Sequence, residues 1–155
     1  MCGIIAIIRR PAQREVPTST RVRKLIDSIP DATPEDLKGI HLLIESLALL
    51  ESETSGVPGT ISLLDDSELL TLLIEKCKIV ETSINKLERT LDKTNSDLKD
   101  VEKINACIIQ VKDLLWSLSN DRVRLINSVR ELCQDKRDIG LVETFTSIHE
   151  ALSAL

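Results

Sequence analysis

The residue best placed for chemistry is Cys2, which follows the initiator methionine in the opening stretch MCGIIAIIRR. Methionine before a small residue is normally removed, so the Cys2 thiol would stand beside its own α-amino group at the chain terminus. That amine titrates at about pH 8, close to the thiol, and can accept and later return the thiol proton. Cys2 could thus be a nucleophile with its own amine as general base. Two alternatives stay open: a second residue without a role, and a palmitoylated cysteine, although no basic or amphipathic flank supports acylation.

An element that could hold this nucleophile follows at once. Residues 3–8 are an unbroken apolar run rich in β-branched side chains, which predicts a strand buried on both faces. Six residues alone are also compatible with a buried helical turn. Gly3 leaves room for a substrate, and a rigid strand would fix the position of Cys2. Pro11 ends the run, and residues 11–20 are predicted to be a connector.

Composition predicts that the rest of the chain is helical. The 155 residues, enough for one domain, include one Trp, one Phe and no Tyr, so the core must consist of Leu, Ile and Val, which suits helix packing. The net charge is −5 with Lys and Arg dispersed among acidic residues, which argues against nucleic-acid binding. No stretch approaches the roughly 20 apolar residues of a membrane span. We expect a cytoplasmic protein.

The four cysteines have no spacing typical of a metal site or a disulfide framework, and we expect neither metal nor cofactor. Cys77, Cys107 and Cys133 lie at or beside predicted core positions, where a cysteine usually serves packing. His41 and His149 have no carboxylate or thiol at a spacing that would indicate a joint site.

Helix signals divide the remaining chain. We predict a first helix from Thr20 to Ile29, ending before Pro30, and a second that is capped by Thr33 with Pro34 at its first position. The stretch TSGVPGT at 54–60 is predicted to be a loop, and a last helix is expected at 141–154.

Two long apolar seams with three- and four-residue spacing lie between these helices, which is typical of coiled-coil-like packing. They predict a long antiparallel hairpin at about 66–134 inside a helical bundle spanning 17–155. The first seam is Leu70, Leu73, Cys77, Val80, Ile84, Leu87 and Leu91; the second is Val101, Ile104, Ile108, Val111, Leu115, Leu118, Arg122, Leu125, Val129 and Leu132.

Two residues of the segment that carries the second seam stand out. Arg122, beside Asp121 and Arg124, interrupts the seam and is interpreted as a polar break, with a buried functional pair as the alternative. Trp116 follows a seam residue and is interpreted as a cap on the hairpin packing, with a ligand platform as the alternative. The seams could be satisfied within one chain, or the longer helix could pair with a second copy to form a homodimer.

The start MCGIIAII resembles that of the class II glutamine amidotransferases, whose domain is an αββα layer structure with an N-terminal nucleophile. The resemblance implies that Met1 is removed and that Cys2 attacks the side-chain amide of glutamine. Ammonia is then released, and water hydrolyses the thioester that remains.

The segments IIAIIRRP, SGVPG at 55–59, VKDLLWSLSNDRVR at 111–124 and HEALSAL are similar to an actinobacterial subgroup of glucosamine-6-phosphate synthase-like enzymes. In that subgroup a helical segment separates the first strand from the rest of the domain. The resemblance thus implies that residues 1–10 are the first strand of an incomplete αββα domain and that residues 17–155 are a helical insertion.

The same resemblance implies an N-terminal part of a larger enzyme that converts fructose 6-phosphate and glutamine to glucosamine 6-phosphate and glutamate. The sequence contains no Arg-Gly and no Asn-Gly, the elements with which the family binds the glutamine carboxylate and stabilises the oxyanion. We therefore expect this part alone to be inactive and to need the remaining amidotransferase and sugar-phosphate-binding domains. The alternative is a self-contained helical interaction module without a catalytic role.

Overall fold

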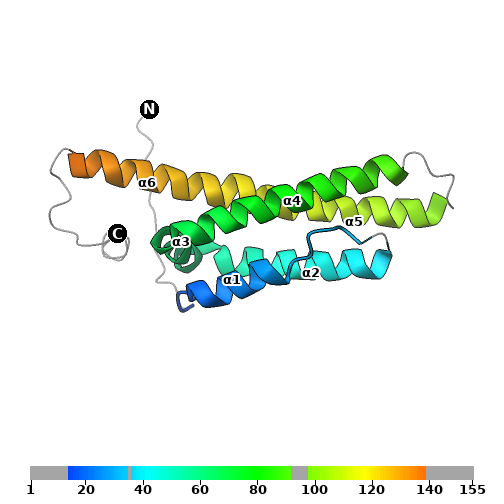
Figure 1. The fold of residues 1–155 in the computed structure, drawn as a ribbon, viewed down its shortest axis with the longest axis horizontal. Coiled ribbons are helices and arrows are strands. Elements are labelled where there is room, and N and C mark those ends of the chain that lie inside the picture. Colours follow the sequence, from blue (N-terminus) through cyan, green and yellow to red (C-terminus); the bar gives the residue numbers. More distant parts are fainter. Residues whose placement is uncertain (1–13, 35, 92–97, 139–155) are drawn as a thin grey trace, which may run out of the picture.

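The computed structural model of the chain describes residues 14–34, 36–91 and 98–138 (Figure 1). The predicted strand at 3–8 with Cys2, the predicted helix at 141–154 and His149 lie outside these residues. Within the described part the chain is a bundle of helices and contains no strand. The prediction of a mainly helical bundle is confirmed.

The elements follow one another with short connections. Their order is α1 (Ser19–Ser28), α2 (Leu37–Thr54), α3 (Gly56–Asp65), α4 (Ser67–Leu91), α5 (Leu98–Trp116), the π-helical segment η1 (Ser117–Arg122) and α6 (Val123–Asp138). The last three form one continuous rod. Figure 1 shows α4 lying alongside this rod, while α2 packs along α5 and α1 packs against α2 and α4.

Local signals fix where α1 begins and ends. The Thr18 side chain caps it by accepting a hydrogen bond from the Arg21 backbone N–H at 3.3 Å. The helix ends just before Pro30, because the residue that precedes a proline avoids the helical region. The bounds agree with the prediction to within one residue.

The predicted start of α2 is wrong. Its cap is Asp36, which accepts a hydrogen bond from the Gly39 backbone N–H at 3.0 Å. A carboxylate at this end also interacts favourably with the helix dipole. Thr33 serves a different contact, since its backbone N–H donates to Ser83 Oγ on α4 at 2.6 Å. Tertiary packing therefore holds Thr33 outside the helix.

The predicted loop at TSGVPGT is also wrong, because α3 begins inside it at Gly56. Gly56 adopts a φ of +65°, which allows the abrupt change of direction between α2 and α3. Pro58 lies in the first turn, where its missing N–H has no helical partner to lose. A Cβ at Gly59 would overlap the backbone of Thr54, so a glycine is needed where α3 crosses the end of α2.

The core consists of aliphatic side chains from all the helices. The seam of α4 is confirmed: Leu70, Leu73, Cys77, Val80, Ile84 and Leu87 are buried, and Leu91 packs against them. On the rod, Ile108, Val111, Leu115 and Leu118 are buried as predicted. The helix most extensively packed against α5 is α2, so the rod belongs to a multi-helix core.

The second seam departs from the prediction after Leu118. The predicted core residue Leu125 is 45% exposed, whereas its neighbour Ile126 is 1% exposed and packs in the core. The cause is η1, because a π-helical turn inserts one residue relative to an α-helix and delays the following positions by one.

Candidate functional site

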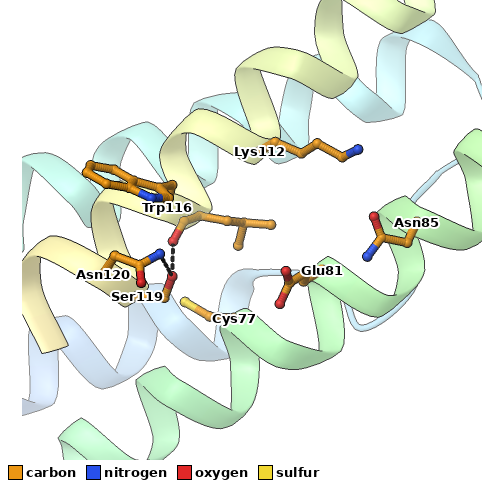
Figure 2. Close-up of a pocket in the computed structure, with 8 residues that line it drawn as sticks. Cys77, Glu81, Asn85, Lys112, Trp116, Ser119 and Asn120 are labelled. Carbon is orange, nitrogen blue, oxygen red and sulfur yellow. Dashed lines mark hydrogen bonds between the residues drawn. The ribbon is translucent and has the colours of Figure 1, made fainter. Parts of the chain in front are cut away.

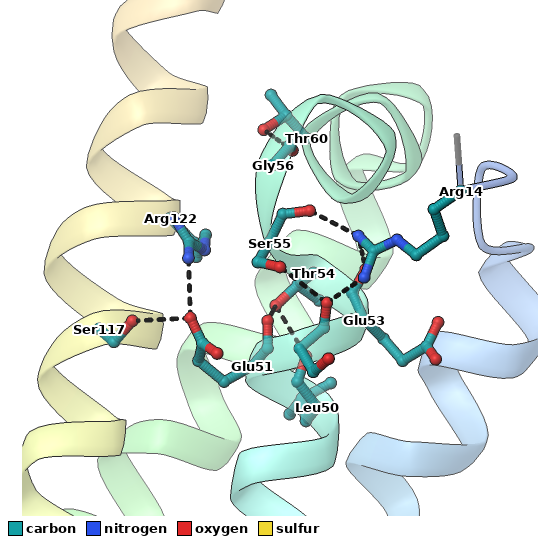
Figure 3. A network of polar contacts seen from close by, with 11 residues as sticks. Arg14, Leu50, Glu51, Glu53, Thr54, Ser55, Gly56, Thr60, Ser117 and Arg122 are labelled. Carbon is teal, nitrogen blue, oxygen red and sulfur yellow. Dashed lines mark hydrogen bonds and ion pairs between the residues drawn. The ribbon is translucent and has the colours of Figure 1, made fainter. Parts of the chain in front are cut away.

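The predicted nucleophile Cys2 lies outside the described residues, so its geometry stays a prediction. What the structure describes is the point at which the N-terminal segment reaches the bundle. There the Arg14 guanidinium donates to the backbone carbonyls of Ser52, of Glu53 at 3.2 Å and of Ser55 at 2.6 Å (Figure 3). These carbonyls lie in the last turn of α2 and at the cap residue that follows it, where a cation also interacts favourably with the helix dipole. Arg14 thus anchors the N-terminal segment to the α2–α3 junction.

The polar break at Arg122 has a partner on α2. Arg122 Nη2 lies 2.8 Å from Glu51 Oε1, and Ser117 Oγ donates to the same oxygen at 3.2 Å (Figure 3). The side chains of Arg122 and Glu51 are 20% and 27% exposed, so the ion pair is partly shielded from water. Asp121 and Arg124 are exposed. The pair ties η1 to α2.

A thiol and an imidazole meet elsewhere between α2 and α5. Cys107 Sγ lies 3.9 Å from His41 Nε2, and Cys107 is buried. Sequence spacing did not indicate this contact, since 66 residues separate the two positions. The distance allows a weak sulfur hydrogen bond, which orients both side chains at the helix interface. The core position of Cys107 is confirmed, while the side chain of Cys133 lies outside the described residues.

A cleft lies between α4 and the rod (Figure 2). Its volume is about 330 Å³, and its walls include Glu81 and Asn85 from α4 and Lys112, Trp116 and Asn120 from the rod. The buried side chains of Cys77 and Leu115 provide its apolar lining. The cleft therefore has an apolar interior and polar walls, an arrangement typical of small-molecule sites.

The Cys77 thiol is not a nucleophile at neutral pH. Burial, together with the negative charge of Glu81, raises its pKa to about 11. Because the thiolate is the reactive form, a thiol that stays protonated is a poor nucleophile. The prediction that Cys77 serves packing is confirmed by its place in the core.

The polar side chains of the cleft differ in the hydrogen bonds and ion pairs that they make. Lys112 Nζ lies 2.8 Å from both carboxylate oxygens of Glu88. The Asn120 amide makes a long 3.5 Å contact with Ser119 Oγ. Glu81 and Asn85 make no side-chain hydrogen bond or ion pair with any residue that the structure describes. These two groups remain available to a ligand.

Trp116 is exposed. The interpretation of Trp116 as a cap on helix packing is wrong, because its side chain is 59% exposed at the edge of the cleft. Its position follows from the register of α5, in which Leu115 faces the core and the next residue turns outward.

The described segments contain no group of three or more His, Cys, Asp or Glu residues arranged to hold a metal ion. None of their helices is long and apolar enough to span a membrane. Comparisons with models of protein families, with curated proteins and with solved structures found no match to this chain.

Proposed function

We propose that this chain is the N-terminal part of a glutamine-dependent amidotransferase, with Cys2 as its nucleophile. The observation that carries the proposal is the stretch MCGIIAII, which places a cysteine and a glycine directly after the initiator methionine and an apolar run directly behind them. After removal of Met1, this position gives the thiol a base in its own α-amine.

The proposed reaction begins when the α-amine takes the Cys2 proton and the sulfur attacks the side-chain carbonyl carbon of glutamine. The C–N bond then breaks, the amine returns its proton to the leaving nitrogen, and ammonia departs from a thioester. Water hydrolyses the thioester to glutamate and restores the thiol. In the parent enzyme, the ammonia would convert fructose 6-phosphate to glucosamine 6-phosphate.

The helical body supports the part of the proposal that concerns an insertion. Residues 14–34, 36–91 and 98–138 have their own core, and Arg14, the first described residue, is hydrogen-bonded to the α2–α3 junction. An insertion of this kind can add to an enzyme without contributing to its sheet. Because the family's Arg-Gly and Asn-Gly elements are missing, this part alone would lack carboxylate binding and oxyanion stabilisation, which provide much of the rate.

The alternative proposal is a helical interaction module without catalysis. It is favoured by the same self-contained core, which needs no sheet to bury its apolar side chains. The two proposals predict different coding sequences after the codon for Leu155. An open reading frame that continues past Leu155 into an Arg-Gly-containing motif would support the amidotransferase, and a stop codon there would favour the module.

Substitution of Cys2 tests the chemistry in the full-length parent protein. We expect Cys2→Ala to abolish glutamine hydrolysis, measured as glutamate release, while the circular dichroism spectrum is unchanged. Cys77→Ala is the matched control, because this buried thiol lies in the helical body, and it should retain activity. Full glutaminase activity in Cys2→Ala would refute the assignment, as would Met1 retained in the mature protein by mass spectrometry.

A further inference from the structure

We propose that the cleft between α4 and the rod binds a small organic cation that carries a primary ammonium or guanidinium group. This proposal does not depend on the amidotransferase proposal. Its main determinants are Glu81, Asn85 and Trp116.

The charge of the ligand follows from the ionised groups that line the cleft. Lys112 and Glu81 are the charged residues of the lining, and Lys112 is neutralised by Glu88 through two contacts of 2.8 Å. Glu81 has no such partner among the described residues. The carboxylate of Glu81 therefore leaves the cleft with an unbalanced negative charge, which favours a cation over an anion.

The position of Cys77 supports this view of the cleft. Glu81 and the buried Cys77 both line it, so the carboxylate lies close to the apolar lining. Glu81 itself is exposed, so water screens its attraction for a cation, and the apolar lining adds contacts for the rest of the ligand.

The neighbouring groups suit an organic cation better than a bare metal ion. Figure 2 shows Glu81 and Asn85 directed from α4 toward the rod, so a carboxylate and an amide oxygen could accept hydrogen bonds from N–H donors. The exposed Trp116 offers an indole ring at the edge, and such rings attract ammonium and guanidinium groups. The lining by Cys77 and Leu115 suits an aliphatic portion of the ligand.

The backbone also contributes to this cleft. Ser119 and Asn120, which are consecutive residues of η1, both line it. A π-helical turn is wider than an α-helical turn and is found frequently at functional sites. The π-helical segment therefore lies where the rod borders the cleft.

Fluorescence provides a direct test, because Trp116 is the one tryptophan in the sequence. We would titrate the 155-residue chain at constant ionic strength with agmatine and with n-butylamine, and use 1-butanol as the neutral analogue. We expect a saturable change in Trp116 emission with both amines at about millimolar concentrations, and none with the alcohol.

Variants separate the site from a general charge effect. Glu81→Gln keeps the size of the side chain and removes its charge, and it should weaken amine binding by roughly two- to fivefold, as expected for an exposed ion pair. Glu75→Gln removes an exposed carboxylate from a different face of α4 and should leave binding unchanged. Circular dichroism would verify that both variants fold.

Three outcomes would overturn the proposal. They are a Trp116 signal that does not saturate by about 50 mM amine, equal affinity in the Glu81→Gln variant, and equal binding of the neutral alcohol. Equal weakening by Glu75→Gln would indicate nonspecific attraction to an acidic chain and would also count against the cleft.

Discussion

At the scale of single residues, Cys77 links burial to pH dependence. Its pKa is raised to about 11 from an ordinary value of 9.0, so the folded state holds the proton more tightly than the unfolded chain does. The resulting stabilisation is fully present below pH 9 and is lost as the pH rises through 11. We therefore expect Cys77 to contribute a fall of about 2–3 kcal/mol in the free energy of unfolding across this interval.

The matched variant for this prediction is Cys77→Ala, which has no thiol to titrate. It should be less stable than the wild type at pH 8, because truncation leaves a cavity, and the difference should narrow by about 2–3 kcal/mol near pH 11. Urea unfolding at several pH values measures both proteins. A pH-independent difference would contradict the raised pKa.

A second prediction at this scale concerns the ion pair between Arg122 and Glu51, whose side chains are 20% and 27% exposed. Glu51→Gln should lower the free energy of unfolding by about 1–3 kcal/mol, because it leaves a partly buried guanidinium without its counter-charge. The control is Glu88→Gln. Glu88 pairs with Lys112, and these side chains are 43% and 40% exposed, so the loss of this pair should cost less than about 1 kcal/mol. Equal losses in the free energy of unfolding would show that partial burial of the Arg122–Glu51 pair does not increase its contribution to stability.

At the scale of elements, η1 behaves as an insertion of one residue within a long helix. Deleting Asn120, an exposed residue of η1, should convert this segment to a regular α-helix while Ile126 still faces the core. We expect the thermal midpoint to change by only a few degrees. A deletion of Ala106, an exposed residue of α5, should instead rotate the following seam by about 100° and unfold the bundle.

Thermal melts followed by circular dichroism compare the two deletions directly. If both variants lost their structure to the same extent, η1 would not be a removable insertion, and the exchange of Leu125 for Ile126 in the core would need another cause. Leu125 supplies a second measurement. It is 45% exposed, so a cysteine at position 125 should react readily with a thiol reagent, whereas one at the 1% exposed position 126 should not.

At the scale of the whole molecule, most of the described seam positions are buried within one chain. The seam of α4 and the residues Ile108, Val111, Leu115 and Leu118 of the rod pack against other helices of the same chain, so these positions are not free to pair with a second copy. Of the two alternatives, we therefore predict a monomer at micromolar concentrations. Sedimentation velocity measures this, and a concentration-dependent dimer would favour pairing through the rod.

Local sequence signals determined much of this fold. The period of the α4 seam, the stop before Pro30 and the burial of Cys77 follow from contacts within a few turns of one helix, where side-chain spacing alone sets which face is apolar. The chemistry of Cys2 is likewise a matter of sequence, because a thiol beside a terminal amine needs no distant residue to exist.

Tertiary structure decided the features that depend on partners far apart in the chain. Glu51 and Arg122 are 71 residues apart, and 66 residues separate His41 from Cys107, so no local pattern could pair them. The start of α3 inside TSGVPGT depends on how closely Gly59 approaches Thr54. The choice of Ile126 over Leu125 follows the register of η1 and the packing of the rod against its neighbours. The sequence alone therefore determined the features that depend on apolar spacing within one helix. Tertiary packing determined the features that depend on contacts between two helices.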